Sequence, residues 1–169
     1  MIDAGVLAVE LVNQGRRPAH MVVYDWTETV AAPVHVDVAI DGVVAVPVAD
    51  DTYAVTVTGP NRFVREFAGT LSGSGGMIEV SSTVSPDPLA INLLIGNTSD
   101  DEVAVTIVGQ VYGTSTERVM VAAGERMERF RSVANAHGWY DVVVTVEDDP
   151  TFHRRLTGHI ETGRPSVTG

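Results

Sequence analysis

The sequence predicts an all-β protein built from two tandem antiparallel β-sandwich modules of the Ig-like, Greek-key type. Three observations support this: β-branched residues dominate the composition, apolar and polar residues alternate along the chain, and the pattern recurs in a second copy. Valine supplies 30 and threonine 16 of the 169 residues, against 7 leucines, and β-branched side chains favour strands. Residues 125–136 come nearest to a helical period, and we interpret them as strand and loop.

Alternating segments define about twelve short strands. Eight of these strands have their apolar positions, in chain order, within 7–11, 22–26, 34–40, 43–48, 53–57, 89–95, 103–107 and 140–146. Clusters of Gly, Asn, Asp and Pro separate them at 13–15, 59–61, 97–101 and 148–150, where turns are expected. Asp41-Gly42 predicts a two-residue type I′ turn that joins segments 34–40 and 43–48 in a hairpin.

An internal repeat divides the chain. Residues 53–58 resemble 140–145, residues 63–69 resemble 152–158, and residues 7–11 resemble 89–93. The Ser-Gly-Ser-Gly-Gly stretch at 72–76 has the composition of a flexible linker. We therefore predict a first domain at 1–75 and a second at 76–169, each forming its own sheets.

The two copies differ at their starts. The second copy has a strand-like segment, 77–80, ahead of its first matched strand, and the first copy has only six residues before Leu7. We therefore expect the first copy to lack its first strand. Because natural proteins avoid an exposed pairing edge, we also expect that the chain is a fragment that begins inside a longer protein.

Charge and missing residue types exclude several functions. The chain has 11 arginines, no lysine and 22 acidic residues, a formal net charge of −11, and such a chain repels phosphate backbones. Nucleic acid is therefore not expected as a partner. The absence of lysine excludes Schiff-base chemistry, and the absence of cysteine excludes disulfides and thiolate ligands. No signal peptide opens the sequence, and no apolar run approaches the ~20 residues of a spanning helix.

Two stretches carry a family resemblance. The first, residues 59–69, reads Gly-Pro-Asn-Arg-Phe-Val-Arg-Glu-Phe-Ala-Gly; the second comprises residues 138–141 and 154–166 and contains Gly-His-Ile-Glu-Thr-Gly-Arg-Pro-Ser. They resemble the tandem C-terminal domains of bacterial phosphocholine-preferring (non-haemolytic type) phospholipases C. Arg62 stands where that family usually has glycine, and residues 30–51 match poorly.

The resemblance implies a non-catalytic accessory region of a secreted or periplasmic enzyme that hydrolyses choline phospholipids. Its partner would be the N-terminal catalytic domain of the same polypeptide, which the region packs on or orients; a lipid interface is a second partner left open. The family's catalytic residues match no position here, so we expect no catalytic residue, cofactor or metal ligand. The alternative is a free-standing adhesion or carbohydrate-binding β-sandwich protein, because fold does not fix function.

The family-motif residues are expected to be structural or to lie at an interface. They are Gly59, Pro60, Asn61, Phe63, Arg65, Phe67, Gly69, Gly138, Trp139, Tyr140, Phe152, Arg154, Gly158, His159, Glu161, Gly163, Arg164 and Pro165. Residues 59–61 favour a turn. Arg65 and Arg154 each lie between apolar residues on one strand face, so they need a partner. We expect them to occupy equivalent positions with an acidic or carbonyl partner; phosphate recognition is the alternative.

The remaining polar and aromatic candidates have a structural and a functional interpretation. No histidine pair has metal-ligand spacing, and the pair His35 and Asp37 is expected to be solvated. The acidic tips at 100–101 and 147–149 are expected to be solvated turns rather than calcium sites. Aromatic residues at 24, 26, 139 and 140 favour core or interface over a platform for sugar or choline.

Overall fold

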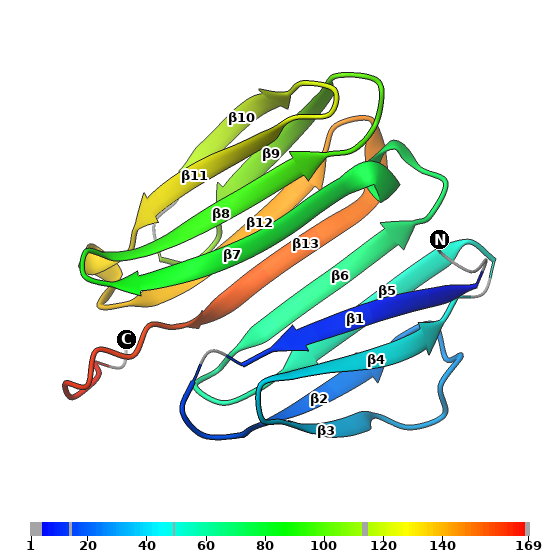
Figure 1. Ribbon diagram of the computed structural model, residues 1–169. Coiled ribbons are helices and arrows are strands. Elements are labelled where there is room, and N and C mark those ends of the chain that lie inside the picture. The colour runs from blue at the N-terminus through cyan, green and yellow to red at the C-terminus, as the bar shows by residue number, and fades with distance from the viewer. Residues whose placement is uncertain (1–4, 14, 49, 113–114, 168–169) are drawn as a thin grey trace.

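The computed structural model describes residues 5–13, 15–48, 50–112 and 115–167, and strands dominate it (Figure 1). In chain order the strands are β1 (Val6–Val12), β2 (Ala19–Asp25), β3 (Val34–Val38), β4 (Asp41–Pro47), β5 (Thr52–Thr58), β6 (Val64–Thr70), β7 (Ile78–Pro86), β8 (Leu89–Asn97), β9 (Val103–Gly109), β10 (Thr116–Val121), β11 (Arg126–Ser132), β12 (Trp139–Val146) and β13 (Asp149–His159). Two short 3₁₀ turns, η1 (Ser74–Met77) and η2 (Ala134–Ala136), accompany them.

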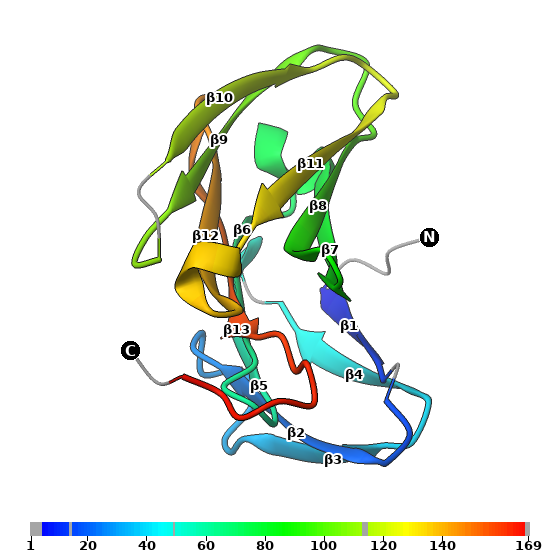
Figure 2. The same ribbon diagram turned by 90° about the vertical axis from the view of Figure 1, so that its left-hand side faces the viewer.

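The strands form two layers. One eight-stranded antiparallel sheet has the order β10-β9-β12-β13-β6-β5-β2-β3, and two smaller sheets, β1-β4 and β11-β8-β7, lie opposite it (Figure 2). The predicted all-β sandwich architecture is confirmed. The expectation that each copy forms its sheets alone is wrong, because β6 of the first copy pairs with β13 of the second. Each sandwich would otherwise expose the edge of its last strand, and this pairing covers both edges.

The two copies have the same internal pairing. In the first copy β1 pairs with β4, β2 with β3 and β5, and β5 with β6. In the second copy β8 pairs with β11, β9 with β10 and β12, and β12 with β13. Strands β1 to β6 therefore correspond to β8 to β13. Strand β7, which pairs with β8, has no counterpart in the described part of the first copy.

Each copy buries its own apolar cluster between the layers. The first is built from valines with one leucine and one methionine; its valines include Val23, Val38 and Val55. The second is larger and holds Phe152 and a row of β8 residues, Ile91, Leu93 and Ile95, that are fully buried. Separate cores fit two modules, and the boundary near residue 75 stays a prediction. None of the helical segments in the described residues is long and apolar enough to cross a membrane.

The expected hairpin at Asp41-Gly42 does not form. Strand β3 pairs with β2 and strand β4 pairs with β1, so the chain crosses from one layer to the other at residues 39–40. A type I′ turn requires positive φ at both central residues, and neither Asp41 nor Gly42 has it. Alternation alone predicted the strands correctly, but the same pattern suits a crossover between layers as well as a hairpin.

The linker between the copies is held in place. Gly75 is buried in η1, and its N–H donates to Asp149 Oδ2 over 3.1 Å. Asp149 is 5 % exposed, so the expectation of a solvated acidic tip is wrong for this residue. Burial opposes its ionisation, but hydrogen bonds from Thr151, Gly75 and Phe152 more than offset this and lower its pKa.

We predict that Gly75→Ala destabilises the protein. A Cβ at this position would lie 2.6 Å from the Phe152 side chain, and overpacking of this kind costs about 1 to 3 kcal/mol. Gly42→Ala is the matched control, since its Cβ would meet nothing closer than 3.7 Å. Urea unfolding of both variants measures the difference, and equal midpoints would contradict the tight packing of the linker.

Candidate functional site at the seam between the two copies

Strands β6 and β13 form the seam, an antiparallel ladder that joins the copies. Its register pairs Phe67 with Arg154 and Arg65 with Leu156, with Glu66 opposite Arg155 at the centre. Because side chains alternate along a strand, Arg65 and Arg154 point to the inner face, and Glu66 and Arg155 to the outer face. Corresponding residues of the two copies therefore lie on either side of a pseudo-twofold axis through the central pair.

On the inner face Arg65 binds oxygens of the second copy. Its Nη1 donates to the carbonyl of Thr157 over 2.9 Å, and also to the carbonyl of its neighbour Val64. Its Nη2 donates to the Tyr140 hydroxyl over 3.1 Å and to Ser82 Oγ over 3.3 Å. The guanidinium thus reaches across the seam and ties β6 to β13, β12 and β7.

Arg154 makes equivalent bonds to carbonyl and tyrosine oxygens, and those that cross the seam go to the first copy. Its Nη1 donates to the carbonyl of Ala68 over 2.7 Å and to that of His153, and its Nη2 donates to the Tyr53 hydroxyl over 2.5 Å. The two arginines therefore occupy equivalent positions, as predicted, and take carbonyl partners. The partner strand belongs to the other copy, which the sequence pattern did not reveal.

A glycine opposite each tyrosine allows this geometry. Tyr53 pairs with Gly69 across β5 and β6, and Tyr140 pairs with Gly158 across β12 and β13. A Cβ at Gly69 would lie 2.8 Å from the Tyr53 hydroxyl, and one at Gly158 would lie 2.5 Å from that of Tyr140. Each ring therefore lies over its glycine and presents its hydroxyl to the arginine of the other copy. Tyr53 was missed as a site residue, although the repeat aligned it with Tyr140.

The inner arginines are cations among neutral partners. In the described part of the chain neither Arg65 nor Arg154 forms an ion pair. Aromatic rings flank both: Arg65 lies 4.2 Å from the ring centre of Phe63, and Arg154 lies 4.1 Å from that of Phe152. Burial lowers the pKa of Arg154, and its contact with Tyr53 opposes that shift. A guanidinium keeps its charge under any ordinary condition, so these hydrogen bonds and ring contacts must offset its desolvation.

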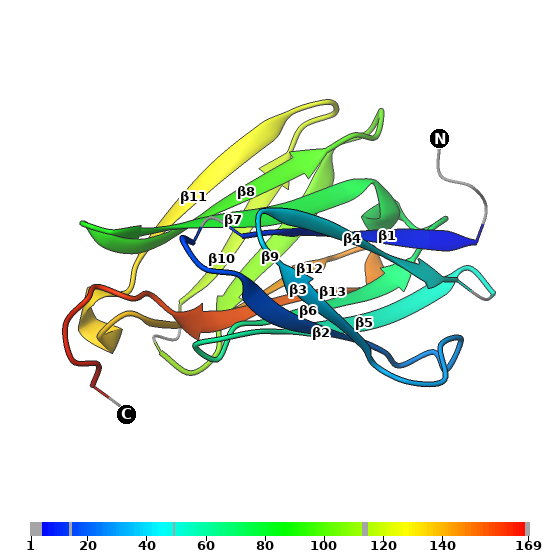
Figure 3. The same cartoon turned by 60° about the horizontal axis from the view of Figure 1, so that its bottom comes forward.

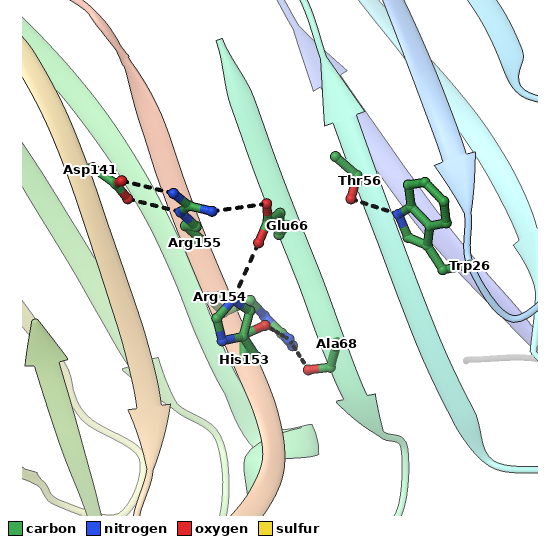
Figure 4. Close-up of polar contacts among 8 residues, drawn as sticks. All are labelled: Trp26, Thr56, Glu66, Ala68, Asp141, His153, Arg154 and Arg155. Carbon is green, nitrogen blue, oxygen red and sulfur yellow. Dashed lines mark hydrogen bonds and ion pairs between the residues drawn. The ribbon is translucent and has the colours of Figure 1, made fainter. Parts of the chain in front are cut away.

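The outer face of the seam carries a separate ionic cluster (Figure 4). Arg155 forms a bidentate pair with Asp141, both bonds 2.9 Å, and contacts Glu66 at 3.5 Å. His153 lies 3.4 Å from the other Glu66 oxygen. Hydrogen bonding to Asp141 raises the pKa of Arg155. The cluster holds β12, β13 and β6 together. It could not be predicted from the sequence, because its members lie on three strands.

A groove of about 730 Å³ lies over the inner face of the seam, between β1 and β7. Tyr53, Arg65, Tyr140 and Arg154 are among the residues that line it, together with Phe63, Phe67 and Leu156. Nine of the predicted motif residues therefore line one concave surface: Pro60, Asn61, Phe63, Arg65, Phe67, Tyr140, Arg154, Gly158 and His159.

The motif at residues 59–61 forms the expected turn. Asn61 and Arg62 have φ of 57° and 56°, and Phe63 N–H donates to the Pro60 carbonyl over 3.0 Å. This is a type I′ turn, which favours Asn-Gly, so the glycine usual in the family has a conformational reason. Here Arg62 takes that conformation and lies 5.3 Å from the Trp139 ring. The turn therefore contacts the second motif stretch, residues 138–141 and 154–166, which is called the C-terminal motif below.

The C-terminal motif forms a second cluster beside the seam. The Trp139 ring lies 4.5 Å from that of His159, and its indole N–H donates to the Val167 carbonyl over 2.8 Å. His159 contacts Glu161 at 3.0 Å and the His137 carbonyl at 3.1 Å. Gly138 and Gly163 both have positive φ. Gly163, Arg164 and Pro165 are exposed and lie apart from the groove.

The remaining candidates lie away from the seam. His35 and Asp37 both contact His20 on β2, at 3.1 and 2.7 Å, and these side chains are exposed. No group of three or more potential metal ligands occurs among residues 5–13, 15–48, 50–112 and 115–167. Trp26 is 65 % exposed on the other face of the sheet, where it donates to Thr56 (Figure 4). Tyr140 is buried and Trp139 points to the opposite face, so these two do not form a platform.

Fold and seam together define a repeat β-sandwich in which the recurrent motif joins two copies. A family model described as "Bacterial phospholipase C, C-terminal domain" matches residues 1–70 and 79–159. The chain belongs to this family, and the resemblance noted in the sequence is confirmed.

Curated relatives include a non-hemolytic phospholipase C of Burkholderia pseudomallei, which is 32% identical over 120 residues. A hemolytic phospholipase C of Pseudomonas aeruginosa is 33% identical over 123 residues. These matches cover 69% and 70% of this chain but only 17% of each relative. The chain therefore corresponds to a C-terminal part of much longer proteins.

We predict that Arg65→Ala and Arg154→Ala each destabilise the protein by about 2 to 4 kcal/mol, because buried acceptors lose a charged donor and the alkyl stem leaves its packing. The matched control is Arg126→Ala, whose side chain is 67% exposed and whose loss should cost within about 0.5 kcal/mol. Urea melts of the three variants give the comparison. Shifts near zero for both seam arginines would indicate that they are free for an intermolecular role.

Proposed function

We propose that this chain is a non-catalytic accessory region of a secreted or periplasmic phospholipase C that hydrolyses choline phospholipids. Its role is to pack against the catalytic domain of the same polypeptide and to orient that domain toward its substrate. The region therefore acts through its packing surfaces and its rigid fold, and it contributes no group that takes part in the reaction.

The observation that carries this proposal is the use of the motif residues at the seam. The guanidinium groups of Arg65 and Arg154 donate to carbonyl and tyrosine oxygens within the chain. Groups committed in this way hold strands together and are poorly placed to bind a lipid phosphate. Each match covers only 17% of its relative, and this also supports an accessory role.

A chimeric enzyme tests the proposal. This chain replaces the matched C-terminal region of the Burkholderia non-hemolytic phospholipase C, and a second form lacks that region entirely. Hydrolysis is measured on phosphatidylcholine vesicles and on soluble p-nitrophenyl phosphorylcholine. We expect the chimera to exceed the deleted form by about tenfold or more on vesicles, because correct positioning of substrate supplies that order of rate.

The isolated chain and two chimera variants serve as controls. The chain alone should turn over neither substrate, and activity that survives chelation and repurification would contradict the proposal. In the chimera, Arg65→Ala combined with Arg154→Ala should lower the vesicle rate, and Arg126→Ala should not. Equal rates for the chimera and the deleted form, together with glycan binding by the isolated chain, would favour the carbohydrate-binding alternative instead.

A further inference from the structure

Strand β1 has an open edge. In the described residues it pairs with β4 alone. The Gly5 carbonyl accepts from Val48 over 2.7 Å and Asn13 N–H donates to Ile40 over 2.8 Å, which fixes the phase of the ladder. Hydrogen-bonded pairs alternate along an antiparallel ladder, so odd-numbered residues of β1 bond to β4. The backbone groups that point away from β4 belong to the even-numbered residues of β1, among them Ala8, Glu10 and Val12.

This edge faces the groove. The walls of the groove are formed by β1 on one side and by residues 80–84 of β7 on the other, and Arg65 and Arg154 lie on its floor. Strand β7 likewise pairs only with β8 in the described part of the chain. Both strands lie above β6 and β13 in Figure 3, and their arrows point the same way in Figure 1. One strand between them can therefore run antiparallel to both.

The repeat shows what occupies the equivalent edge. The strand that corresponds to β1 is β8, and its corresponding edge is covered by β7. With Leu7 aligned to Leu89, the β1 residues Ala8, Glu10 and Val12 correspond to Ala90, Asn92 and Leu94. These three residues pair with Ser85, Thr83 and Ser81 of β7. The Met77 carbonyl accepts from Thr98 in the same ladder, so they are in hydrogen-bonded positions. The open groups of β1 are thus those that a β7-like strand uses.

The two seam arginines differ in one contact, and that contact involves the strand that covers the edge of β8. Arg65 donates to Ser82 Oγ of β7 in addition to a tyrosine hydroxyl. Arg154 has the equivalent tyrosine and carbonyl partners but no described partner that corresponds to Ser82. By the pseudo-twofold relation, a strand on the open edge of β1 would bring its own residue to this position. The partner that Arg154 lacks is therefore the one that such a strand would supply.

We infer that the open edge of β1 is a docking site for an extended strand that pairs antiparallel with Ala8, Glu10 and Val12 and places a hydroxyl or other acceptor beside Arg154. The strand is a segment of the parent phospholipase polypeptide that precedes the region corresponding to this chain, since β7 likewise directly precedes β8. The source of the strand rests on the proposed function. The existence of the site rests on the repeat and the groove. This is strand addition, in which backbone hydrogen bonds give affinity.

Two extended forms of the full chain test the inference. In the first, a copy of residues 77–88 replaces residues 1–6 and leads into Leu7 as the original leads into Leu89. In the second, the stretch of equal length that precedes the matched region in the Burkholderia relative takes that place. Amide hydrogen exchange is followed by NMR. We expect exchange at Ala8, Glu10 and Val12 to slow by at least about tenfold in both, because paired amides exchange only through local opening.

Several controls separate strand pairing from general stabilisation. Leu7, Val9 and Leu11 already bond to β4, so their amides report only the overall change. Glu10→Pro removes an N–H that β4 does not use and should abolish the added protection at Ala8 and Val12, whereas Glu10→Ala should keep it. Ser82→Ala made only in the copied segment should weaken the protection, because Arg154 then loses the added acceptor.

Each outcome decides part of the inference. No selective protection in either extended form would overturn it. Protection by the copied segment without protection by the relative's segment would show that the edge accepts a strand but that its source is wrong. Dimerisation of the unextended chain, with the same three amides protected, would assign the edge to a second copy instead. None of these measurements depends on phospholipase activity, so failure of the proposed function would leave the site itself intact.

Discussion

The structure depends on two partly buried guanidinium groups that form no ion pair with a carboxylate among the described residues. A partly buried cation is tolerated only where its donors are satisfied, and within its own copy each arginine has a described hydrogen bond only to the carbonyl of the preceding residue. Arg65 and Arg154 therefore reach across the seam to a carbonyl and a tyrosine hydroxyl of the other copy. This requirement fixes the register of β6 against β13, since a slip of one residue would turn the arginine of the slipped strand to the outer face.

This constraint determines how the two copies are joined. Each copy alone would be a sandwich with an exposed strand edge, that of β6 in the first copy and that of β13 in the second. Pairing of these two strands covers both edges and forms one continuous sheet. The reciprocity of the arginine contacts makes the joint symmetric, so that loss of either arginine weakens both copies. Asp141 and Glu66 then secure the outer face through Arg155. The buried linker at Gly75 keeps the connection short enough for this arrangement.

Local chemistry explains why much of this could be predicted from the sequence. Alternation located nearly every strand, the repeat aligned the two copies, and the apolar-Arg-apolar pattern identified Arg65 and Arg154 as equivalent. The predictions that failed concerned long-range strand pairing. The crossover at residues 39–40 and the pairing of β6 with β13 depend on which strands are neighbours, and the alternation of apolar and polar residues along one strand contains no such information. Asp141 and Arg155 were missed for the same reason, because they are 14 residues apart in sequence.

The asymmetry between the copies bears on how such a region can serve a larger enzyme. Its recurrent arginines and tyrosines form hydrogen bonds across the seam, which hold the two copies in a fixed arrangement. A fixed shape that leaves the edge of β1 unpaired in the described residues can be joined to another part of a polypeptide through backbone hydrogen bonds, which depend little on side-chain identity. Sequence drift in the joining segment would then be tolerated, whereas drift at Arg65, Arg154, Gly69 or Gly158 would break the seam. The residues that recur in the motif are thus those whose substitution would break the hydrogen bonds or the close packing of the seam.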